Sequence, residues 1–214
     1  MWTAKNITYP AIDEYLFSLL PKSDPVLREM ERYAYMRDIP IIAPAVGRFF
    51  ALLAQISGAK RIFEMGSAIG YSTLWFAMGA GPGAEVHYSD GSADNARRAQ
   101  DYIRRSGMSD RVHIHIGVAQ EKLAETPGEF DMIFIDVDKE QYPATLQQAV
   151  PRIRSGGLFL ADNTLWSGRA ARKAPRGDTR TRGIQRFNRM VYASKGLFPV
   201  IVPFRDGVTL CRKL

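Results

Sequence analysis

Two stretches decide how this chain folds: FDMIFIDVDK at residues 130–139 and GGLFLADNTLW at residues 156–166. In each, a short apolar run ends at an acid. Met132–Ile135 stops at Asp136, and Leu158–Ala161 stops at Asp162 and Asn163. Short apolar runs of this kind are typical of strands buried on both faces of a parallel sheet. Because ligands of open α/β sheets bind at the carboxyl ends of the strands, we expect a site where these two runs end.

The polar residues at that edge suit a hard cation. Asp136, Asp162 and Asn163 offer carboxylate and carboxamide oxygens, the ligands that Mg²⁺ and Ca²⁺ prefer. The alternative is that Asp136 and Asp162 cap helices and hold no metal.

Strand-like and helix-like segments alternate along the chain. Five runs are expected to be strands: 61–65, 85–90, 112–117, 132–136 and 158–162. Four segments between them are expected to be helices: 71–78, 93–105, 120–124 and 142–153. Gly107 is expected to cap the second of these helices, and Gly156 and Gly157 the last. This alternation predicts a doubly wound, mostly parallel sheet of Rossmann-like α/β type.

The ends of the chain complete that prediction. A helix is expected near 183–195, followed by strands at 198–203 and 207–212, which bring the sheet to seven strands. Asp206-Gly207 between the last two strands favours an antiparallel hairpin. Residues 10–57 are expected to form three helices, broken at 21–25 and 40–44. We therefore expect one domain over residues 1–214, with an N-terminal helical segment (1–57) and an α/β core (58–214).

Composition restricts the class of protein. At 214 residues, with 46% hydrophobic and 24% charged residues, the chain is an ordinary globular domain. Its one cysteine, Cys211, excludes an internal disulfide and any zinc site built on several thiolates, and is expected to be buried. No apolar run is long enough to span a membrane, and the N-terminus lacks the pattern of a secretory signal. We therefore expect no membrane partner and a cytoplasmic location.

Basic residues concentrate late in the chain. Residues 164–214 carry twelve Lys/Arg against Asp178 and Asp206, a net charge of +10, whereas residues 1–163 have a net charge of −3. Six of these basic residues lie between Ser167 and Arg182. This segment could meet a phosphate, a nucleic acid or an acidic substrate, or it could be a solvated loop.

A glycine turn follows the first strand. In FEMGSAIGYS (63–72), Gly66 and Gly70 lie four residues apart, a spacing that differs from the G-x-G-x-x-G of dinucleotide sites and matches the E-x-G-x-x-x-G of a nucleoside-binding methyltransferase. Asp90 ends the second strand, where an acid can accept hydrogen bonds from ribose hydroxyls or act as a turn acid. The third strand ends before Ala119 and Gln120, whose small alanine leaves room for an adenine ring.

The histidines are expected to be structural. His113 and His115 alternate on one strand and His87 stands alone on another, without the spacing of a metal site.

Taken together, these motifs resemble those of the cation-dependent O-methyltransferases related to catechol and caffeoyl-coenzyme A O-methyltransferases, including bacterial members. The resemblance runs from about residue 39 to residue 213. Its most specific motifs are FEMGSAIGYS (63–72), FDMIFIDVDKEQY (130–142), GGLFLADNTLWSG (156–168) and PFRDGVTLCRK (203–213).

The resemblance implies S-adenosylmethionine as cofactor and assigns its contacts. The methionine end would be held by Glu64, Gly66, Ser67 and Ser72, the ribose by Asp90, and the adenine by Ala119 and Gln120. Asp138 would lie near the cofactor, and Ile42 would line its pocket from the N-terminal segment.

The resemblance also implies the catalytic residues. Asp136, Asp162 and Asn163 match the ligands of a divalent cation, expected to be Mg²⁺ or another such as Ca²⁺ or Mn²⁺. Lys139 matches a general base or electrostatic partner, with a surface lysine as the alternative. Trp166 is an aromatic that could wall the acceptor pocket or pack in the core, and Ser167 matches a substrate contact.

The acceptor stays open among three alternatives. The first is a small molecule with vicinal hydroxyls of catechol type, the second is 5-hydroxyuridine in tRNA, and the third is a non-catalytic protein that only binds S-adenosylmethionine. Family members are often homodimers, and the aromatic residues Trp2, Tyr9, Tyr15 and Phe17 could supply such an interface.

Overall fold

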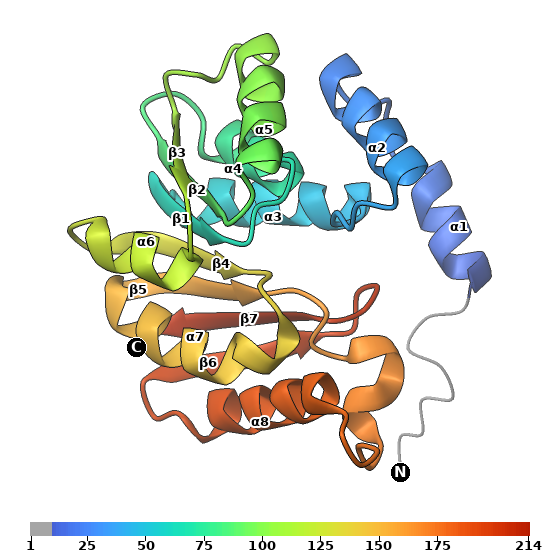
Figure 1. Cartoon of the computed structure of the whole chain (residues 1–214), viewed down its shortest axis with the longest axis vertical. Helices are drawn as coiled ribbons and strands as arrows, with labels where there is room; N and C mark the ends of the chain where they lie inside the picture. Colours follow the sequence, from blue (N-terminus) through green and yellow to red (C-terminus); the bar gives the residue numbers. More distant parts are fainter. Residues whose placement is uncertain (1–9) are drawn as a thin grey trace.

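Seven strands form one twisted sheet with helices on both faces (Figure 1) in the computed structural model, which describes residues 10–214. The strands are β1 (Arg61–Met65), β2 (Glu85–Asp90), β3 (Val112–Ile116), β4 (Phe130–Ile135), β5 (Ile153–Ala161), β6 (Leu197–Val202) and β7 (Val208–Lys213). Their order is β3-β2-β1-β4-β5-β7-β6. Strands β1 to β5 run parallel, and β7 is antiparallel to both β5 and β6. The Rossmann-like fold and the C-terminal hairpin are thus confirmed.

Eight α-helices and three short 3₁₀ turns connect the strands within the described residues. The helices are α1 (Pro10–Ser18), α2 (Pro25–Arg37), α3 (Pro44–Ser57), α4 (Tyr71–Ala80), α5 (Ala93–Arg105), α6 (Ala119–Glu125), α7 (Tyr142–Ala149) and α8 (Thr179–Ala193). The 3₁₀ turns are η1 (Lys139–Gln141), η2 (Val150–Arg152) and η3 (Trp166–Ala171). The three N-terminal helices are confirmed. Pro25 and Pro44 occupy first-turn positions of α2 and α3, where the missing N–H costs nothing.

Each face of the sheet has its own hydrophobic core. In β4, Met132 and Phe134 face the core beneath α3, α4 and α5, whereas Ile133 and Ile135 face the core beneath α7 and α8. All four side chains are fully buried. This is the burial that a continuous apolar run predicts for a central parallel strand.

The connection between α7 and β5 differs from the prediction. The expected helix 142–153 ends at Ala149, continues as η2, and gives way to strand at Ile153. Gly156 and Gly157 therefore do not cap a helix but lie inside β5, beside an irregularity in its pairing with β4. The irregularity needs glycine: Gly156 has φ 76°, and a Cβ on Gly157 would lie 2.8 Å from the Asp131 carbonyl oxygen.

No helix among residues 10–214 is long and apolar enough to cross a membrane. The buried position of Cys211 is confirmed, and burial raises the pKa of its thiol to about 12.

Candidate active site

The glycine turn joins β1 to α4 at the carboxyl edge of the sheet. Gly66 and Gly70 have φ of 88° and 83°, a region that favours glycine. A Cβ on Gly66 would lie 2.5 Å from the Asp136 carbonyl oxygen. Gly70 is the N-cap of α4, and Ser67 accepts a hydrogen bond at its carbonyl from Gly70 N (2.8 Å). The turn therefore packs directly against the end of β4.

Glu64 is a fully buried carboxylate just below this turn. Its two oxygens accept hydrogen bonds from the hydroxyls of Ser72 and Thr73. Burial raises its pKa to about 7, and hydrogen bonds from Ser72, Thr73 and Ser67 oppose that rise. Thr73 was not singled out from the sequence, although it follows the predicted Ser72 directly.

Asp90 lies at the end of β2 beside the glycine turn. Its Oδ2 accepts from Ala68 N (3.0 Å), and its Oδ1 accepts from Ser92 N (2.8 Å) and from the Asn95 amide (3.1 Å). The carboxylate thus orders the turn from across the sheet. Its predicted place near the turn agrees with this geometry, while the ribose contact stays a prediction.

Four further residues predicted to contact the cofactor lie on other segments. Ala119 is buried at the start of α6, and Ile42 is buried ahead of α3. Gln120 donates from its side-chain amide to Gln141 Oε1 (3.1 Å) and Thr145 Oγ1 (2.9 Å). Asp138 is exposed and precedes η1. The contacts of Gln120 direct its amide toward α7.

Strands β4 and β5, which end at Asp136 and Asp162, lie side by side, and both acids lie at the predicted edge of the sheet. Ile135 pairs with Ala161, so Asp136 and Asp162 follow at the same edge. Burial raises the pKa of Asp162 to about 7, and the negative charge of Asp136 adds to the rise. Asp162 Oδ1 accepts from Asn163 N (2.8 Å), and Asn163 has φ 55°.

Three oxygens of this group have no hydrogen-bond partner among residues 10–214: Oδ2 of Asp136, Oδ2 of Asp162 and Oδ1 of Asn163. Nowhere in that range do three His, Cys, Asp or Glu side chains gather so that they could hold a metal ion. The candidate set differs from such a cluster because its third member is an asparagine.

Lys139 lies buried beside Asp136. Its Nζ donates to Asp136 Oδ1 (2.5 Å) and to the hydroxyl of Tyr142 (2.8 Å). That hydroxyl in turn donates to the carbonyl of Asp162 (2.9 Å). With 9% of its surface exposed, Lys139 is not the surface lysine of the alternative interpretation. Burial and the negative charges of Asp136 and Asp162 raise the pKa of Tyr142 well above its usual value, so the hydroxyl stays protonated.

Tyr142 was missed by sequence reasoning. It stands three residues after Lys139 and six after Asp136, across η1 and the first turn of α7. A spacing of three residues on a helical turn places side chains on one face, which was the available signal.

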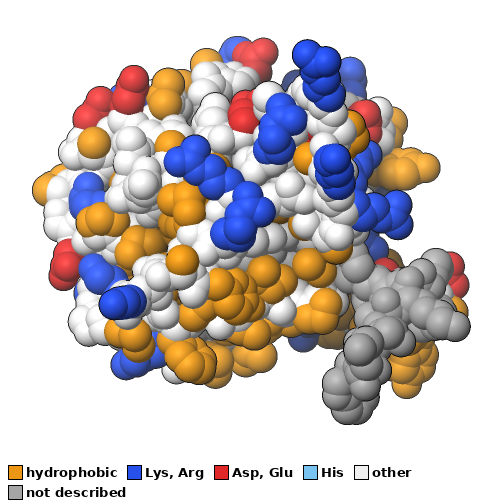
Figure 2. Space-filling view, turned by 90° about the horizontal axis from the view of Figure 1, so that it is seen from below, with side chains coloured by type: hydrophobic (Ala, Val, Ile, Leu, Met, Phe, Trp, Pro, Cys, Tyr) orange, Lys and Arg blue, Asp and Glu red, His pale blue; other side chains and the backbone are white. Residues whose placement is uncertain are grey.

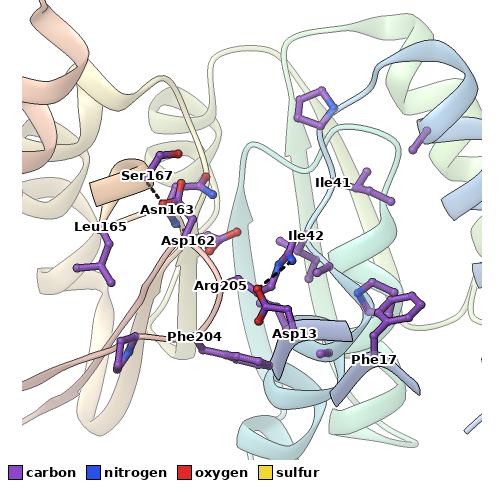
Figure 3. A pocket seen from close by; sticks show the side chains of 18 of the residues that line it. Asp13, Phe17, Ile41, Ile42, Asp162, Asn163, Leu165, Ser167, Phe204 and Arg205 are labelled. Carbon is purple, nitrogen blue, oxygen red and sulfur yellow. Dashed lines mark hydrogen bonds and ion pairs between the residues drawn. The ribbon is translucent and has the colours of Figure 1, made fainter. Parts of the chain in front are cut away.

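A cleft of about 1890 Å³ opens at the Asp162–Asn163 end of the site (Figure 3). One wall comes from α1, α2 and residues 39–46, and the other from residues 162–172 and the hairpin turn 203–206. Ile42, Asp162, Asn163 and Ser167 line it. An ion pair between Asp13 and Arg205 (3.7 Å) joins the two walls.

Trp166 and Ser167 are adjacent in the chain, but only Ser167 lines the cleft. Ser167 is exposed, has φ 51°, and donates its N–H to Asp206 Oδ1. Trp166 instead packs, with Val137 and Ala170, against the core that contains Tyr142 and Phe187, and does not line the cleft. This placement favours the packing alternative for Trp166.

The chain has clear relatives among known proteins. A family model described as O-methyltransferase matches residues 20–214. The chain belongs to this O-methyltransferase family.

Two curated relatives and two solved structures show the extent of the likeness. The chain is 35% identical to a catechol O-methyltransferase of Mycobacterium tuberculosis over 162 residues, 74% of each chain. It is 32% identical to a catechol O-methyltransferase of Niastella koreensis over 203 residues, 92% of this chain and 91% of the relative. An O-methyltransferase of Bacillus cereus in complex with SAH superposes with a TM-score of 0.87 at 30% identity, over 95% and 97% of the two chains. TomG of Streptomyces achromogenes, in complex with SAM, has a TM-score of 0.87 at 25% identity, over 99% of each chain.

This O-methyltransferase uses S-adenosylmethionine as its methyl donor, as the cofactor-bound relatives support. The glycine turn and the buried Glu64 lie at the carboxyl end of β1, where such a cofactor binds in open α/β sheets, and Gly66 lets the turn pack against the backbone of Asp136.

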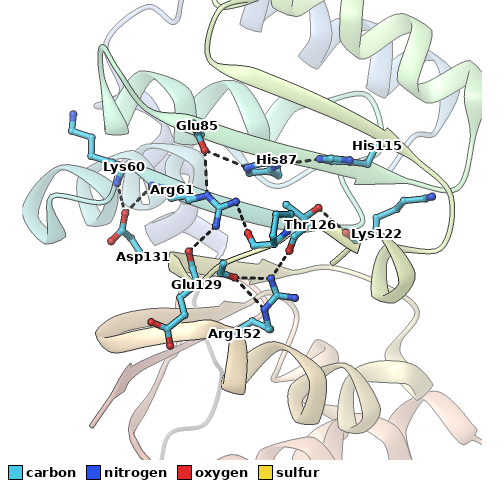
Figure 4. Close-up of polar contacts among 12 residues, drawn as sticks. Lys60, Arg61, Glu85, His87, His115, Lys122, Thr126, Glu129, Asp131 and Arg152 are labelled. Carbon is cyan, nitrogen blue, oxygen red and sulfur yellow. Dashed lines mark hydrogen bonds and ion pairs between the residues drawn. The ribbon is translucent and has the colours of Figure 1, made fainter. Parts of the chain in front are cut away.

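The three histidines of this O-methyltransferase meet across two neighbouring strands, because β2 and β3 pair His87 with His113 and bring His115 close. Its Nδ1 lies 3.0 Å from His115 Nε2 (Figure 4), and its ring stacks at 5.0 Å on that of His113. Burial lowers the pKa of His87 to about 4, with the neighbouring His113, His115 and Arg61 adding to the effect.

Proposed function

We propose that this chain is a divalent-cation-dependent O-methyltransferase that methylates one hydroxyl of a catechol-type small molecule. The observation that carries the proposal is the set of unpartnered oxygens on Asp136, Asp162 and Asn163: Asp162 and Asn163 line the cleft, and Asp136 lies beside the buried Lys139. The two relatives described above, both catechol O-methyltransferases, support the acceptor class.

The donor set fits a hard cation. Burial and, to a smaller extent, the negative charge of Asp136 raise the pKa of Asp162 to about 7, and a bound cation would offset both effects. Mg²⁺, Ca²⁺ and Mn²⁺ all take oxygen ligands of this type. When bound, a divalent cation supplies positive charge that lowers the pKa of a coordinated hydroxyl, and S-adenosylmethionine supplies the methyl group.

The chain's own residues then hold the reactants in place. Asp136, Asp162 and Asn163 would fix the cation at the ends of β4 and β5. Glu64 and the glycine turn would fix the methionine end of the cofactor on β1, one strand away. Holding the two reactants in line supplies a large part of the rate enhancement in such a transfer.

Lys139 is the residue placed to handle a proton. Asp136 and the Tyr142 hydroxyl hold its Nζ at the carboxyl end of β4. From there, a neutral Nζ would accept the proton of the acceptor hydroxyl, whereas a protonated Nζ would stabilise the resulting oxyanion. Ser167 would contact the acceptor from the cleft wall that also carries Asp162 and Asn163.

The decisive test is methyl transfer from labelled S-adenosylmethionine to a panel of acceptors. The panel contains catechol, a 3,4-dihydroxyphenyl acid, phenol and bulk tRNA. We expect label in the two vicinal diols, none in phenol, loss of transfer after chelation, and recovery on adding Mg²⁺. Lys139→Met should lower kcat by about 10²–10⁴. Asp162→Asn should abolish the response to Mg²⁺, whereas Asp94→Asn, at an exposed position of α5, should preserve it.

Two outcomes would contradict separate parts of the proposal. Transfer to catechols that survives chelation would exclude the cation. Label that enters tRNA alone would exclude the catechol class and establish the tRNA alternative.

Three further predictions concern the domain organisation, the location and the oligomeric state. We propose that the chain forms one domain with a helical N-terminal segment, acts in the cytoplasm and forms a homodimer. Tyr15 and Phe17 of α1 are 62% and 57% exposed, as an interface requires, and Trp2 and Tyr9 lie outside the described residues. Sedimentation equilibrium of wild type and of Tyr15→Ser/Phe17→Ser tests the dimer, and a monomeric wild type would exclude it.

A further inference from the structure

A second concave surface lies where η1, α7 and α8 meet. It is a groove of about 500 Å³, lined by Glu140, Pro143, Ala144, Gln147, Thr179, Arg182, Gly183, Arg186 and Arg189. Its lining includes the small uncharged residues Ala144 and Gly183. We refer to this surface as the arginine groove.

The arginine groove lies within the most basic part of the chain. Residues 167–195 contain nine Lys/Arg against the single acid Asp178. Seen from the side where α8 lies, Lys and Arg side chains gather in a band (Figure 2). The only acid that lines the groove, Glu140, is paired with Arg180 (3.8 Å).

The arginines of the groove form a row on α8. Arg182, Arg186 and Arg189 are four and three residues apart, which places them on one face of the helix, separated by about 6 Å and about 4.5 Å along its axis. Arg186 and Arg189 are exposed, and their side chains make no hydrogen bond or ion pair with residues 10–214. Arg182 donates to the carbonyl of Pro175 (3.1 Å), which holds its side chain at one end of the row.

Unpaired arginines kept this close together repel one another and gain from a shared anionic partner. The guanidinium group binds phosphate oxygens through two parallel hydrogen bonds, which distinguishes it from lysine. Seven of the nine basic residues in 167–195 are arginines. A row of such groups along a narrow groove matches a linear chain of phosphates better than a single phosphate or a flat surface.

We propose that the arginine groove binds the phosphodiester backbone of a single-stranded nucleic acid. The row of arginines binds successive phosphates, and the small residues of the lining let the nucleic-acid strand approach α7 and α8. Among residues 179–189 and 140–147, the side chains that line the groove include no aromatic ring for a base to stack on. The groove therefore reads the backbone and not the bases.

The test measures binding of the full-length chain to labelled 12-nucleotide strands of oligouridylate and oligothymidylate by fluorescence anisotropy. No S-adenosylmethionine or acceptor is added, so the result is independent of the proposed methyl transfer. We expect the logarithm of the binding constant to fall linearly with the logarithm of salt concentration, with a slope of about −2 for three phosphate contacts. The two strands should bind within about twofold of one another, because a backbone contact ignores the base.

Arg186→Gln/Arg189→Gln is the decisive variant. It should weaken binding at least about tenfold and make the salt slope less steep by about 1.4, the contribution of two contacts to a single strand. Its thermal unfolding should match wild type, since neither side chain has a partner to lose. The matched control is Arg97→Gln/Arg104→Gln on α5, which changes the net charge equally at the far end of the molecule and should bind like wild type.

Three results would overturn the proposal. The first is an equal weakening of oligonucleotide binding in the variant and in the control, which would show that binding depends only on the overall charge of the protein. The second is wild-type binding that does not depend on salt. The third is capture of the chain by phosphatidylserine vesicles, dependent on Arg186 and Arg189, with no binding of either oligonucleotide, which would assign the surface to a membrane.

Discussion

Gly66 and Asp136 are in direct contact where the cofactor turn meets the end of β4. A Cβ on Gly66 would lie 2.5 Å from the Asp136 carbonyl oxygen, and Asp136 N donates to the carbonyl of Met65 (2.8 Å). The glycine turn, proposed to hold the cofactor, and Asp136, proposed to hold the cation, therefore share a backbone contact. We expect a change in the turn to displace Asp136.

Gly66→Ala tests this contact. The added methyl group meets backbone atoms that cannot move aside, and φ 88° is unfavourable for alanine. We expect the free energy of unfolding to fall by at least about 2 kcal/mol and binding of S-adenosylhomocysteine to weaken. Urea denaturation and calorimetry measure the two effects. Gly58→Ala is the control: it also has positive φ (63°) but open space around it, so it should lose only about 1 kcal/mol and bind normally.

Tyr142→Phe tests the support of Lys139. The substitution removes a hydroxyl that accepts from Lys139 and donates to the Asp162 carbonyl, and leaves both groups buried without that partner. We expect a loss of about 1–3 kcal/mol in stability and a fall in kcat of about tenfold or more. Tyr102→Phe removes a hydroxyl that has no hydrogen bond within residues 10–214, and should change neither quantity appreciably. An unchanged kcat in Tyr142→Phe would assign the hydroxyl to folding alone.

Arg152→Lys tests the polar network at the opposite edge of the sheet (Figure 4). The guanidinium of Arg152 donates to the carbonyls of Leu123 (2.6 Å), Thr126 and Gly128 (2.6 Å), and so fixes the segment between α6 and β4. A lysine ammonium cannot reach all three with one geometry. We expect unfolding by urea to be easier by about 1–3 kcal/mol. Arg97→Lys, at a 75% exposed side chain, should be neutral, and equal losses in both variants would contradict the network's role.

His87 predicts how stability depends on pH. Its pKa is about 4 in the folded chain, against an ordinary value of 6.5, so the unfolded chain binds the proton more readily. The folded state thus has full stability above pH 6.5 and loses stability as pH falls toward 4. Between pH 7 and pH 5 this one group should cost about 2 kcal/mol.

Urea denaturation of wild type and His87→Gln at pH 7 and pH 5 checks this value. The variant should lose less stability on acidification by about that amount. His113→Gln, at an exposed ring, should retain most of the wild-type acid sensitivity. If His87→Gln is as acid-sensitive as wild type, the cause lies in other groups.

Local sequence patterns determined much of the fold and of the candidate site. The apolar runs ending at Asp136 and Asp162 predicted neighbouring strand ends, because burial on both faces requires continuous apolar residues whatever surrounds them. Gly66 and Gly70 predicted the turn, because a backbone with positive φ favours glycine whatever the rest of the chain does. The proline positions predicted the breaks between α1, α2 and α3 for the same local reason.

Tertiary structure alone decided which side chains meet across those elements. The glycines at 156 and 157 resembled a helix cap, yet the pairing of β4 with β5 placed them inside a strand. His87 met His113 and His115 only through the register of β2 on β3. Trp166 turned toward the core, and Tyr142 joined Lys139 to the Asp162 carbonyl. Such contacts depend on packing between segments distant in sequence, and no pattern within one segment encodes that packing.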